Sequence, residues 1–218
     1  MKSKIEDFDK LQPKLTKSGK TRSQIGKSSK TKGKAGERYF ADTLTEISGM
    51  SFIRVPNSGA GVGSLNRERL KVLTKTQGYI QLGDIIPPDN LYNRFIFECK
   101  NYKDLNFSSL LKKEGCKIIK QWIDELAYDC ESAQLYMNEN NIIGLLCIKI
   151  TNKGNWVILN SNYTHLQITV PVLTFIHQTS FNKWNNIFMM CEFKDFIETN
   201  KNTLFANIVP SSNFTLKK

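Results

Sequence analysis

The sequence predicts a mixed α/β domain with a central β-sheet and a helix on each of its faces. Two observations favour this fold class. Apolar segments of strand length alternate with two helical patterns, and their order along the chain is helix, three strands, helix, two strands. Apolar residues make up 40% of the 218 positions, which suffices for one core of ordinary size. We expect this domain to comprise residues 35–218 and a basic arm to comprise residues 1–34.

The first elements of the domain are expected between residues 35 and 102. The segment AGERYFADTLTEISG (35–49) repeats its apolar side chains with helical spacing and ends at a glycine. SFIRVP (51–56) and YIQLGDII (79–86) have the apolar pattern of strands, and a Gly-rich loop with basic residues lies between them. RFIFECKNY (94–102) is predicted to pair with 79–86 as an antiparallel neighbour, because the turn residues PPDN come between them.

The second half of the chain is expected to add a long helix and further strands. An amphipathic helix is predicted over 109–130, weakened near Gly115. The continuous apolar run NIIGLLCIKI (141–150) is typical of a central strand. The smaller predicted elements are strands over 156–160 and 166–170, a short helix over 172–178 and a short element over 193–198.

Charge is distributed unevenly between the arm and the domain. Residues 1–36 hold eleven Lys or Arg against three Asp or Glu, so they carry +8 of the net +11 of the chain. The stretch 14–34 has almost no core-forming residue, and we expect it to be disordered alone and to become ordered on binding. A basic arm on a nearly neutral domain favours a nucleic-acid partner, because each neutralised phosphate releases counterions. The alternative is a solvated tail without a partner.

The cysteine pattern and the N-terminus predict an intracellular protein, in the cytoplasm or near the nucleoid. The five cysteines are scattered without a CxxC pair, which suits reduced thiols better than a disulfide framework or a zinc site. The first residues lack the apolar segment of a secretory signal, and no run is long enough to span a membrane. Cys99, Trp122 and Trp184 are expected in the core, and the isolated His165 and His177 are expected to be structural.

Charged residues stand at unusual places near the ends of two predicted strands. Asp84 interrupts the apolar run LGDII, and Glu98 and Lys100 follow the apolar FIF with one residue between them. Residues two apart point to the same face of a strand, so this carboxylate and ammonium lie side by side. Asp84 and Glu98 would repel each other unless a cation or a proton is present, and Mg²⁺ prefers carboxylate oxygens. Glu37 on the first helix could supply a third ligand. The alternatives are a surface ion pair at the strand end and a carboxylate stabilised by the helix dipole.

These motifs resemble those of the PD-(D/E)xK nucleases. The pattern GD…ECK is similar to the family signature, although a glycine rather than a proline precedes the aspartate. GERYFADTL, with Glu37, resembles the first helix of the Holliday-junction resolvase-like branch. RVPNSGAG, with Ser58, resembles the strand and Ser/Gly loop that follow it, and Gln121 stands where many members have a glutamine. The core of the resemblance covers residues 35–150, and extra C-terminal elements over 155–218 lie outside it.

The resemblance implies a restriction-endonuclease-like fold and a Mg²⁺- or Mn²⁺-dependent endonuclease that leaves a 5′-phosphate. It implies that Glu37, Asp84 and Glu98 hold the metal. Lys100 would position the attacking water or offset charge in the transition state, and Ser58 and Gln121 would complete the catalytic set. The residues expected to contact nucleic acid are Lys32, Lys34, Arg38, Ser58, Arg67, Arg69, Lys71 and Lys103.

Several substrates remain open at the level of sequence. Branched DNA is expected from the resolvase-like motifs, and symmetric cleavage of a junction by one site per chain would require a homodimer with two-fold symmetry. A sequence-specific or general nuclease acting on DNA or RNA has the same site residues. A nucleic-acid-binding module without chemistry is the alternative of another class, and it would need neither metal nor the lysine.

Overall fold

The computed structural model describes residues 21–56, 72–88, 91, 94–112, 115–137, 142–163, 166–167, 171–179 and 184–205. The chain divides into two units, and the boundary lies between Ala35 and Gly36. The second unit holds the β-sheet and the predicted site. Among the described helices, none combines the length and apolarity that a membrane span requires.

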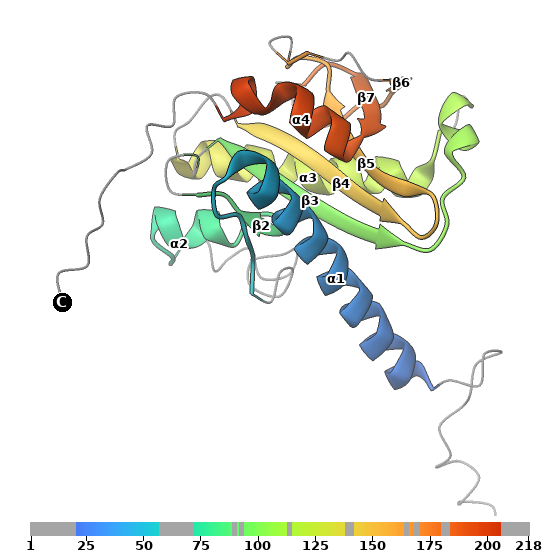
Figure 1. Cartoon of the computed structure of the whole chain (residues 1–218), viewed down its shortest axis with the longest axis horizontal. Coiled ribbons are helices and arrows are strands. Elements are labelled where there is room, and N and C mark those ends of the chain that lie inside the picture. Colours follow the sequence, from blue (N-terminus) through green and yellow to red (C-terminus); the bar gives the residue numbers. More distant parts are fainter. Residues whose placement is uncertain are drawn as a thin grey trace, which may run out of the picture. The chain divides into compact units, whose positions relative to one another are not determined.

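A five-stranded mixed sheet forms the centre of the second unit (Figure 1). Its strands, in spatial order, are β3 (Phe95–Tyr102), β4 (Ile143–Ile150), β5 (Gly154–Asn160), β7 (Ile187–Glu192) and β6 (Leu173–Ile176). The pair β3–β4 is parallel, whereas the other three pairs are antiparallel. The fold is therefore α/β with a mixed central sheet, as the sequence predicts. The two-residue strands β1 (Ile53–Arg54) and β2 (Ile85–Ile86) make a separate antiparallel pair.

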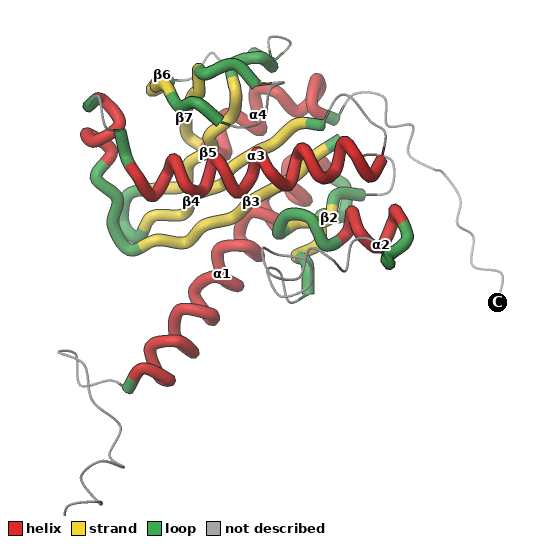
Figure 2. The backbone as a smooth tube through the Cα atoms, turned by 180° about the vertical axis from the view of Figure 1, so that it is seen from behind, coloured by secondary structure: helices red, strands yellow, loops and turns green. Residues whose placement is uncertain are grey.

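Helices cover both faces of the sheet. The long helix α3 (Lys117–Met137) lies on one face, which Figure 2 turns toward the viewer. On the other face pack α4 (Phe193–Leu204) and the part of α1 (Arg22–Ser48) that belongs to the second unit. The short helices α2 (Lys75–Ile80) and η3 (Phe107–Leu111) add to the layer that contains α3.

Each face of the sheet has its own apolar core, and the alternation along β3 shows how the strand serves both. Phe95 and Phe97 pack with the aromatic side chains of α1 and α4, whereas Ile96 between them packs with α3. Because successive side chains of a strand alternate, Glu98 and Lys100 continue the α3 face. Cys99 packs against the α1–α4 core, as predicted, and burial raises the pKa of its thiol well above the usual value.

The other core predictions are also confirmed. Trp122, which belongs to α3, and Trp184 are buried in the core between α3 and the sheet. All five cysteines are free thiols.

The structure corrects the predicted disorder of residues 22–34 and the predicted strand over 79–86. Helix α1 begins at Arg22, because the side chain of Thr21 accepts from the backbone N–H of Gln24 and the side chain of Gln24 accepts from the backbone N–H of Thr21. This pair of hydrogen bonds caps the helix. The rest of the predicted arm, residues 1–20, lies outside the described residues. In the same way Thr74 and Gln77 form a capping box, so that residues 75–80 are helical and only Ile85–Ile86 remain a strand.

Further corrections concern the second half of the chain. The predicted helix over 109–130 is broken at Gly115, whose φ is +66°, so η3 and α3 are separate elements. The predicted helix over 172–178 is the strand β6, because its short apolar run pairs with β7. The sequence interpretation did not include β7 itself. The predicted strand over 166–170 is described only at residues 166–167, which are not in a strand.

Candidate active site

Two hydrogen bonds hold Asp84 at the edge of β3 that faces away from β4. Its backbone N–H donates to the carbonyl of Phe97 at 2.7 Å, and its Oδ2 accepts the N–H of Cys99 at 2.8 Å. The carboxylate thus occupies the position that the carbonyl of a neighbouring strand would take. The antiparallel pairing of 79–86 with 94–102 was predicted wrongly, because β2 pairs with β1 instead. These two hydrogen bonds nevertheless bring Asp84 to the residue between Glu98 and Lys100.

The glycine before Asp84 is required by this close approach. Gly83 has a φ of +74°, a conformation that residues with a Cβ rarely adopt. A Cβ at this position would lie 2.7 Å from the carbonyl oxygen of Phe97. A proline, whose φ is fixed near −65°, could not adopt the same backbone. The departure from the usual motif therefore has a local structural reason.

Glu98 and Lys100 form a close pair on the α3 face. The Lys100 Nζ lies 2.6 Å from Glu98 Oε1, and the two side chains are only 22% and 14% exposed, respectively. Burial raises the pKa of the Glu98 carboxyl, and Lys100 opposes this shift, whereas the negative charges of Glu125 and Glu37 add to it. Although burial lowers the pKa of Lys100, its carboxylate partners Glu98 and Glu125 outweigh that effect and raise the pKa above 10.5. Lys100 is therefore a cation at neutral pH.

Glu125 on α3 is a second partner of this lysine, and the sequence interpretation missed it. Its Oε2 accepts from Lys100 Nζ at 2.7 Å, and its Oε1 accepts from Gln121 Nε2 at 3.0 Å. Gln121 thus contacts the site through Glu125 rather than directly. The signal was available, because residues four apart share a helix face and Glu125 follows Gln121 at that spacing. The Lys100 ammonium also lies 6.0 Å from the centre of the Trp122 ring.

Glu37 lies near this cluster but is held by another residue. Its Oε2 accepts from Arg54 Nη1 on β1 at 3.0 Å, and its side chain is 12% exposed. Its charge is close enough to raise the pKa of Glu98. Arg54 is a further residue that sequence reasoning missed, although it stands inside the apolar strand FIRVP.

The carboxylates of Asp84 and Glu98 have the chemistry that a Mg²⁺ or Mn²⁺ ion requires. Mg²⁺ in proteins is commonly held by one or two carboxylates together with water and substrate phosphate. Within the described part of the chain, no three His, Cys, Asp or Glu side chains stand together as a metal site. The roles of Asp84, Glu98 and Glu37 as metal ligands stay predictions.

The other predicted residues are dispersed. Ser58, Arg67, Arg69, Lys71 and His165 lie outside the described residues. The exposed Lys32 and Lys34 belong to the first unit, whereas Arg38 is exposed on α1 and Lys103 is exposed after the end of β3. His177, just after β6, bonds Asp124, the residue before Glu125 on α3.

Comparisons with known proteins identify the family of this chain. Residues 28–206 match the family described as "Phage putative PDDEXK endonuclease". The chain is also 31% identical over 132 residues to "Protein D14" of Escherichia phage T5, a match that covers 60% of this chain and 69% of that protein. No solved structure matches. The family match spans most of the chain and includes Asp84, Glu98 and Lys100, so this protein belongs to the phage PD-(D/E)xK endonuclease family, which supports a nuclease of the hydrolase class.

Proposed function

We propose that this protein is a DNA endonuclease that hydrolyses phosphodiester bonds with Mg²⁺ or Mn²⁺ held by Asp84 and Glu98. The observation that carries the proposal is the position of Asp84 on the N–H of Cys99, between Glu98 and Lys100. A bound divalent cation would polarise the phosphate and lower the pKa of a water molecule. In this proposal Asp84 and Glu98 supply the negative charge that attracts the cation, and Lys100 supplies an ammonium beside them.

Lys100 acts in this proposal as a donor and not as a base. Its raised pKa keeps the ammonium charged, so it can donate to the attacking water or to a phosphate oxygen. Glu125 holds the ammonium from α3, and Gln121 holds Glu125 in turn. The lysine would therefore keep a partner when Glu98 is engaged by a cation.

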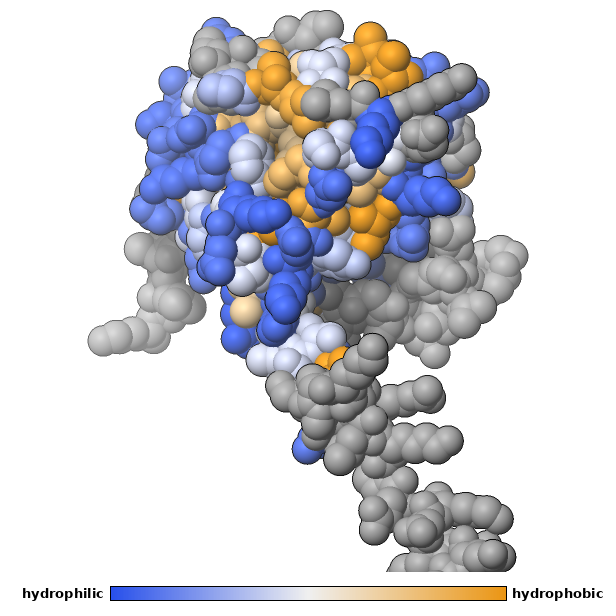
Figure 3. Space-filling model, turned by 90° about the vertical axis from the view of Figure 1, so that its right-hand side faces the viewer, coloured by the Kyte–Doolittle hydropathy of each residue, from blue (hydrophilic) through white to orange (hydrophobic). Residues whose placement is uncertain are grey.

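Cleavage of branched DNA by a homodimer inside the phage-infected cell is the finer part of the proposal. It rests on the resemblance of the first helix and the Ser/Gly loop to junction resolvases. Among the described residues, the large hydrophobic side chains that are most exposed are Val72, Leu135 and Ile176. They belong to different segments, and Figure 3 shows hydrophobic areas at the middle and the top of one face, with hydrophilic areas on either side. They do not by themselves define a dimer interface.

The test compares cleavage of junction, flap and linear DNA and of RNA, with Mg²⁺, Mn²⁺ or a chelator. Asp84→Asn keeps an oxygen that can accept from Cys99 but loses the charge, and Lys100→Met keeps the aliphatic stem. We expect each to reduce cleavage by about 100-fold or more, which is typical when a group that stabilises transition-state charge is removed. Asp104→Asn is the matched control, because Asp104 is exposed and pairs with Lys153 on the surface.

Each outcome separates the candidate functions. Equal cleavage by wild type and both site variants would exclude the proposed site. Binding of DNA without cleavage under any metal condition would favour the non-catalytic module. Paired symmetric incisions of a junction by a dimeric species would support the resolvase-like substrate, and cleavage of linear duplex alone would contradict it.

A further inference from the structure

An open pocket lies beside the site, along α3. Its volume is about 600 Å³, within the range of small-ligand sites. The described residues that line it are Lys117, Lys120, Gln121, Asp124, Glu125, Tyr128 and His177. All except His177 come from one face of α3, since they recur at three- and four-residue spacing.

The wall formed by His177 is held in place from three sides. Its Nε2 lies 2.8 Å from Asp124 Oδ1, and its backbone N–H donates to the carbonyl of Asn186. The ring centre is 6.2 Å from that of Phe188 in the core. Only 11% of the His177 side chain is exposed, so the end of β6 and the middle of α3 form a preorganised wall.

The charges of the pocket suit an anion at one end. Lys117 and Lys120 stand in the first turns of α3, where the structure has no acidic residue. Cations at a helix N-terminus are repelled by the positive end of the helix dipole. A bound anion would interact favourably with the cations and with that end of the dipole. The two carboxylates of the pocket have cationic or polar partners, Asp124 with His177 and Glu125 with Lys100 and Gln121.

The other end of the pocket suits a base. Tyr128 follows Lys120 by eight residues, about 12 Å along the helix axis, which is the scale of one nucleotide. Aromatic rings bind bases of any sequence by stacking. The imidazole of His177 and the amide of Gln121 add polar groups that can contact a base edge.

The pocket is continuous with the active site through one side chain. Glu125 lines the pocket with 42% of its side chain exposed and also accepts from Lys100. We propose that the pocket binds one nucleotide of the cleaved strand beside the scissile bond, with its phosphate at Lys117 and Lys120 and its base against Tyr128 and His177. The identity of this nucleotide as part of the substrate rests on the proposed function, whereas nucleotide binding itself does not.

The test measures binding of thymidine 5′-monophosphate and of inorganic phosphate to the full-length wild-type protein by NMR titration, without a divalent metal. We expect the nucleotide to bind more tightly than phosphate. Tyr128→Leu should weaken nucleotide binding by about fivefold or more, the size of one lost stacking contact. Lys117→Ala/Lys120→Ala should also weaken it, because it removes the two cations that face the phosphate. Tyr128→Phe, which keeps the ring, should bind like the parent.

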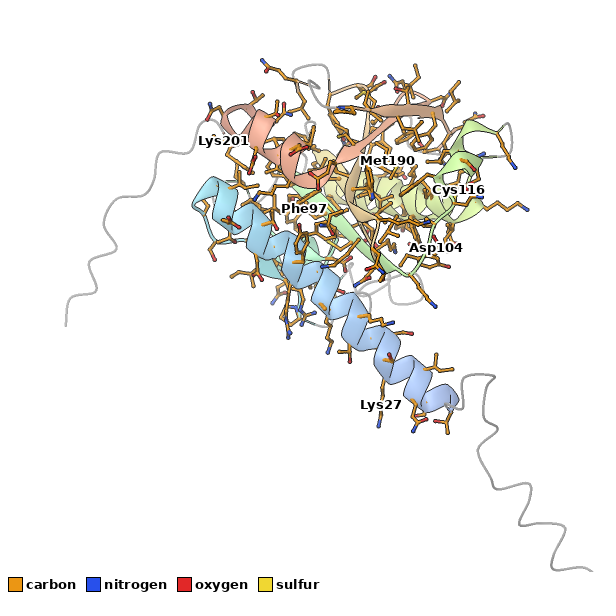
Figure 4. All side chains as sticks on the ribbon, turned by 45° about the vertical axis from the view of Figure 1, so that its right-hand side comes forward. Lys27, Phe97, Asp104, Cys116, Met190 and Lys201 are labelled. Carbon is orange, nitrogen blue, oxygen red and sulfur yellow. The ribbon has the colours of Figure 1, made fainter. Side chains whose placement is uncertain are left out.

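The control is Lys194→Ala/Lys201→Ala, which removes the same charge from α4 on the opposite face. Figure 4 shows Lys201 well separated from Cys116, the residue just before α3. Equal weakening by both double variants, or equal binding of phosphate and nucleotide, would overturn the proposal. So would the absence of nucleotide binding in a protein that cleaves DNA. If the wild-type protein binds the nucleotide but cleaves no nucleic acid, the nucleotide pocket would be supported and the proposed nuclease function would be contradicted.

Discussion

At the scale of single residues, opposing effects act on the protonation of the Glu98 carboxyl. Burial favours its protonated form, and the negative charges of Glu125 and Glu37 act in the same direction. The ammonium of Lys100, at 2.6 Å, favours the carboxylate. Because the folded protein binds this proton more tightly than the unfolded chain, Glu98 lowers the free energy of unfolding as pH rises from 4.5 through its folded pKa.

Carboxyl NMR titration should therefore give a pKa for Glu98 above 4.5. Glu125→Gln should lower this value, since it removes a repulsive charge, and Lys100→Met should raise it further. Activity that depends on ionised Glu98 should persist to lower pH in Glu125→Gln than in the wild type. Glu198→Gln, remote on α4, should leave the titration unchanged. A Glu98 pKa at or below 4.5, or equal shifts in both site variants, would contradict this account.

At the scale of elements, the turn that connects α2 to β2 decides where Asp84 stands. Gly83→Ala combines a left-handed φ, which costs about 1–2 kcal/mol for a residue with a Cβ, with a contact of 2.7 Å to the carbonyl of Phe97. We expect a lower melting temperature and a loss of cleavage, because the turn must shift and carry Asp84 off the N–H of Cys99. Thermal unfolding and cleavage assays on the same preparations measure both effects.

The control variant Gly49→Ala separates the effect of a left-handed φ from the effect of a close contact with a neighbouring carbonyl. Gly49 has nearly the same φ, +71°, but a Cβ there would meet nothing within 4 Å. It should lose stability through φ alone and keep full activity. If both variants lose stability equally and both retain activity, the close approach to Phe97 does not position Asp84.

The same turn shows how far the sequence could predict the site. The alternation FIFECK fixed the faces of β3, so Glu98, Lys100 and Cys99 were placed correctly from a period of two. The strand expected over 79–86 was wrong, because a local capping box made its first residues helical. Asp84 arrives at β3 all the same, through two hydrogen bonds from a turn. The spacing of four places Glu125 on the helix face of Gln121, but its contact with Lys100 and the contact of Arg54 with Glu37 are tertiary and could not be predicted from local patterns.

At the scale of the whole molecule, the excess positive charge is concentrated in the N-terminal residues. Residues 1–36 carry +8 of the net +11, and the helical part of this segment repeats its lysines. Lys27, Lys30 and Lys34 are exposed and share one face of α1 by their spacing. Residues 22–34 therefore form a helix with an exposed cationic face, where the sequence predicted disorder.

Replacing Lys27, Lys30, Lys32 and Lys34 by Gln tests whether this array contacts phosphates. If each lysine neutralises one phosphate, the slope of log K against log salt should fall by roughly three to four, at about 0.9 per contact. Turnover of DNA at saturation should not change, because Asp84, Glu98 and Lys100 are intact. Salt-dependent binding to duplex DNA, measured with Ca²⁺ in place of Mg²⁺, gives the slope, and single-turnover cleavage with Mg²⁺ gives the rate.

A control with the same loss of charge takes its lysines from the second unit: Lys112, Lys153, Lys194 and Lys201. If replacing these four lysines lowers the slope as much as replacing the four lysines of α1, the affinity for DNA depends on net charge and α1 has no specific role. If only the helical four lower it, α1 contacts the phosphate backbone of DNA. Separate elements would then determine affinity and catalysis, so that variants of one should leave the other almost unchanged.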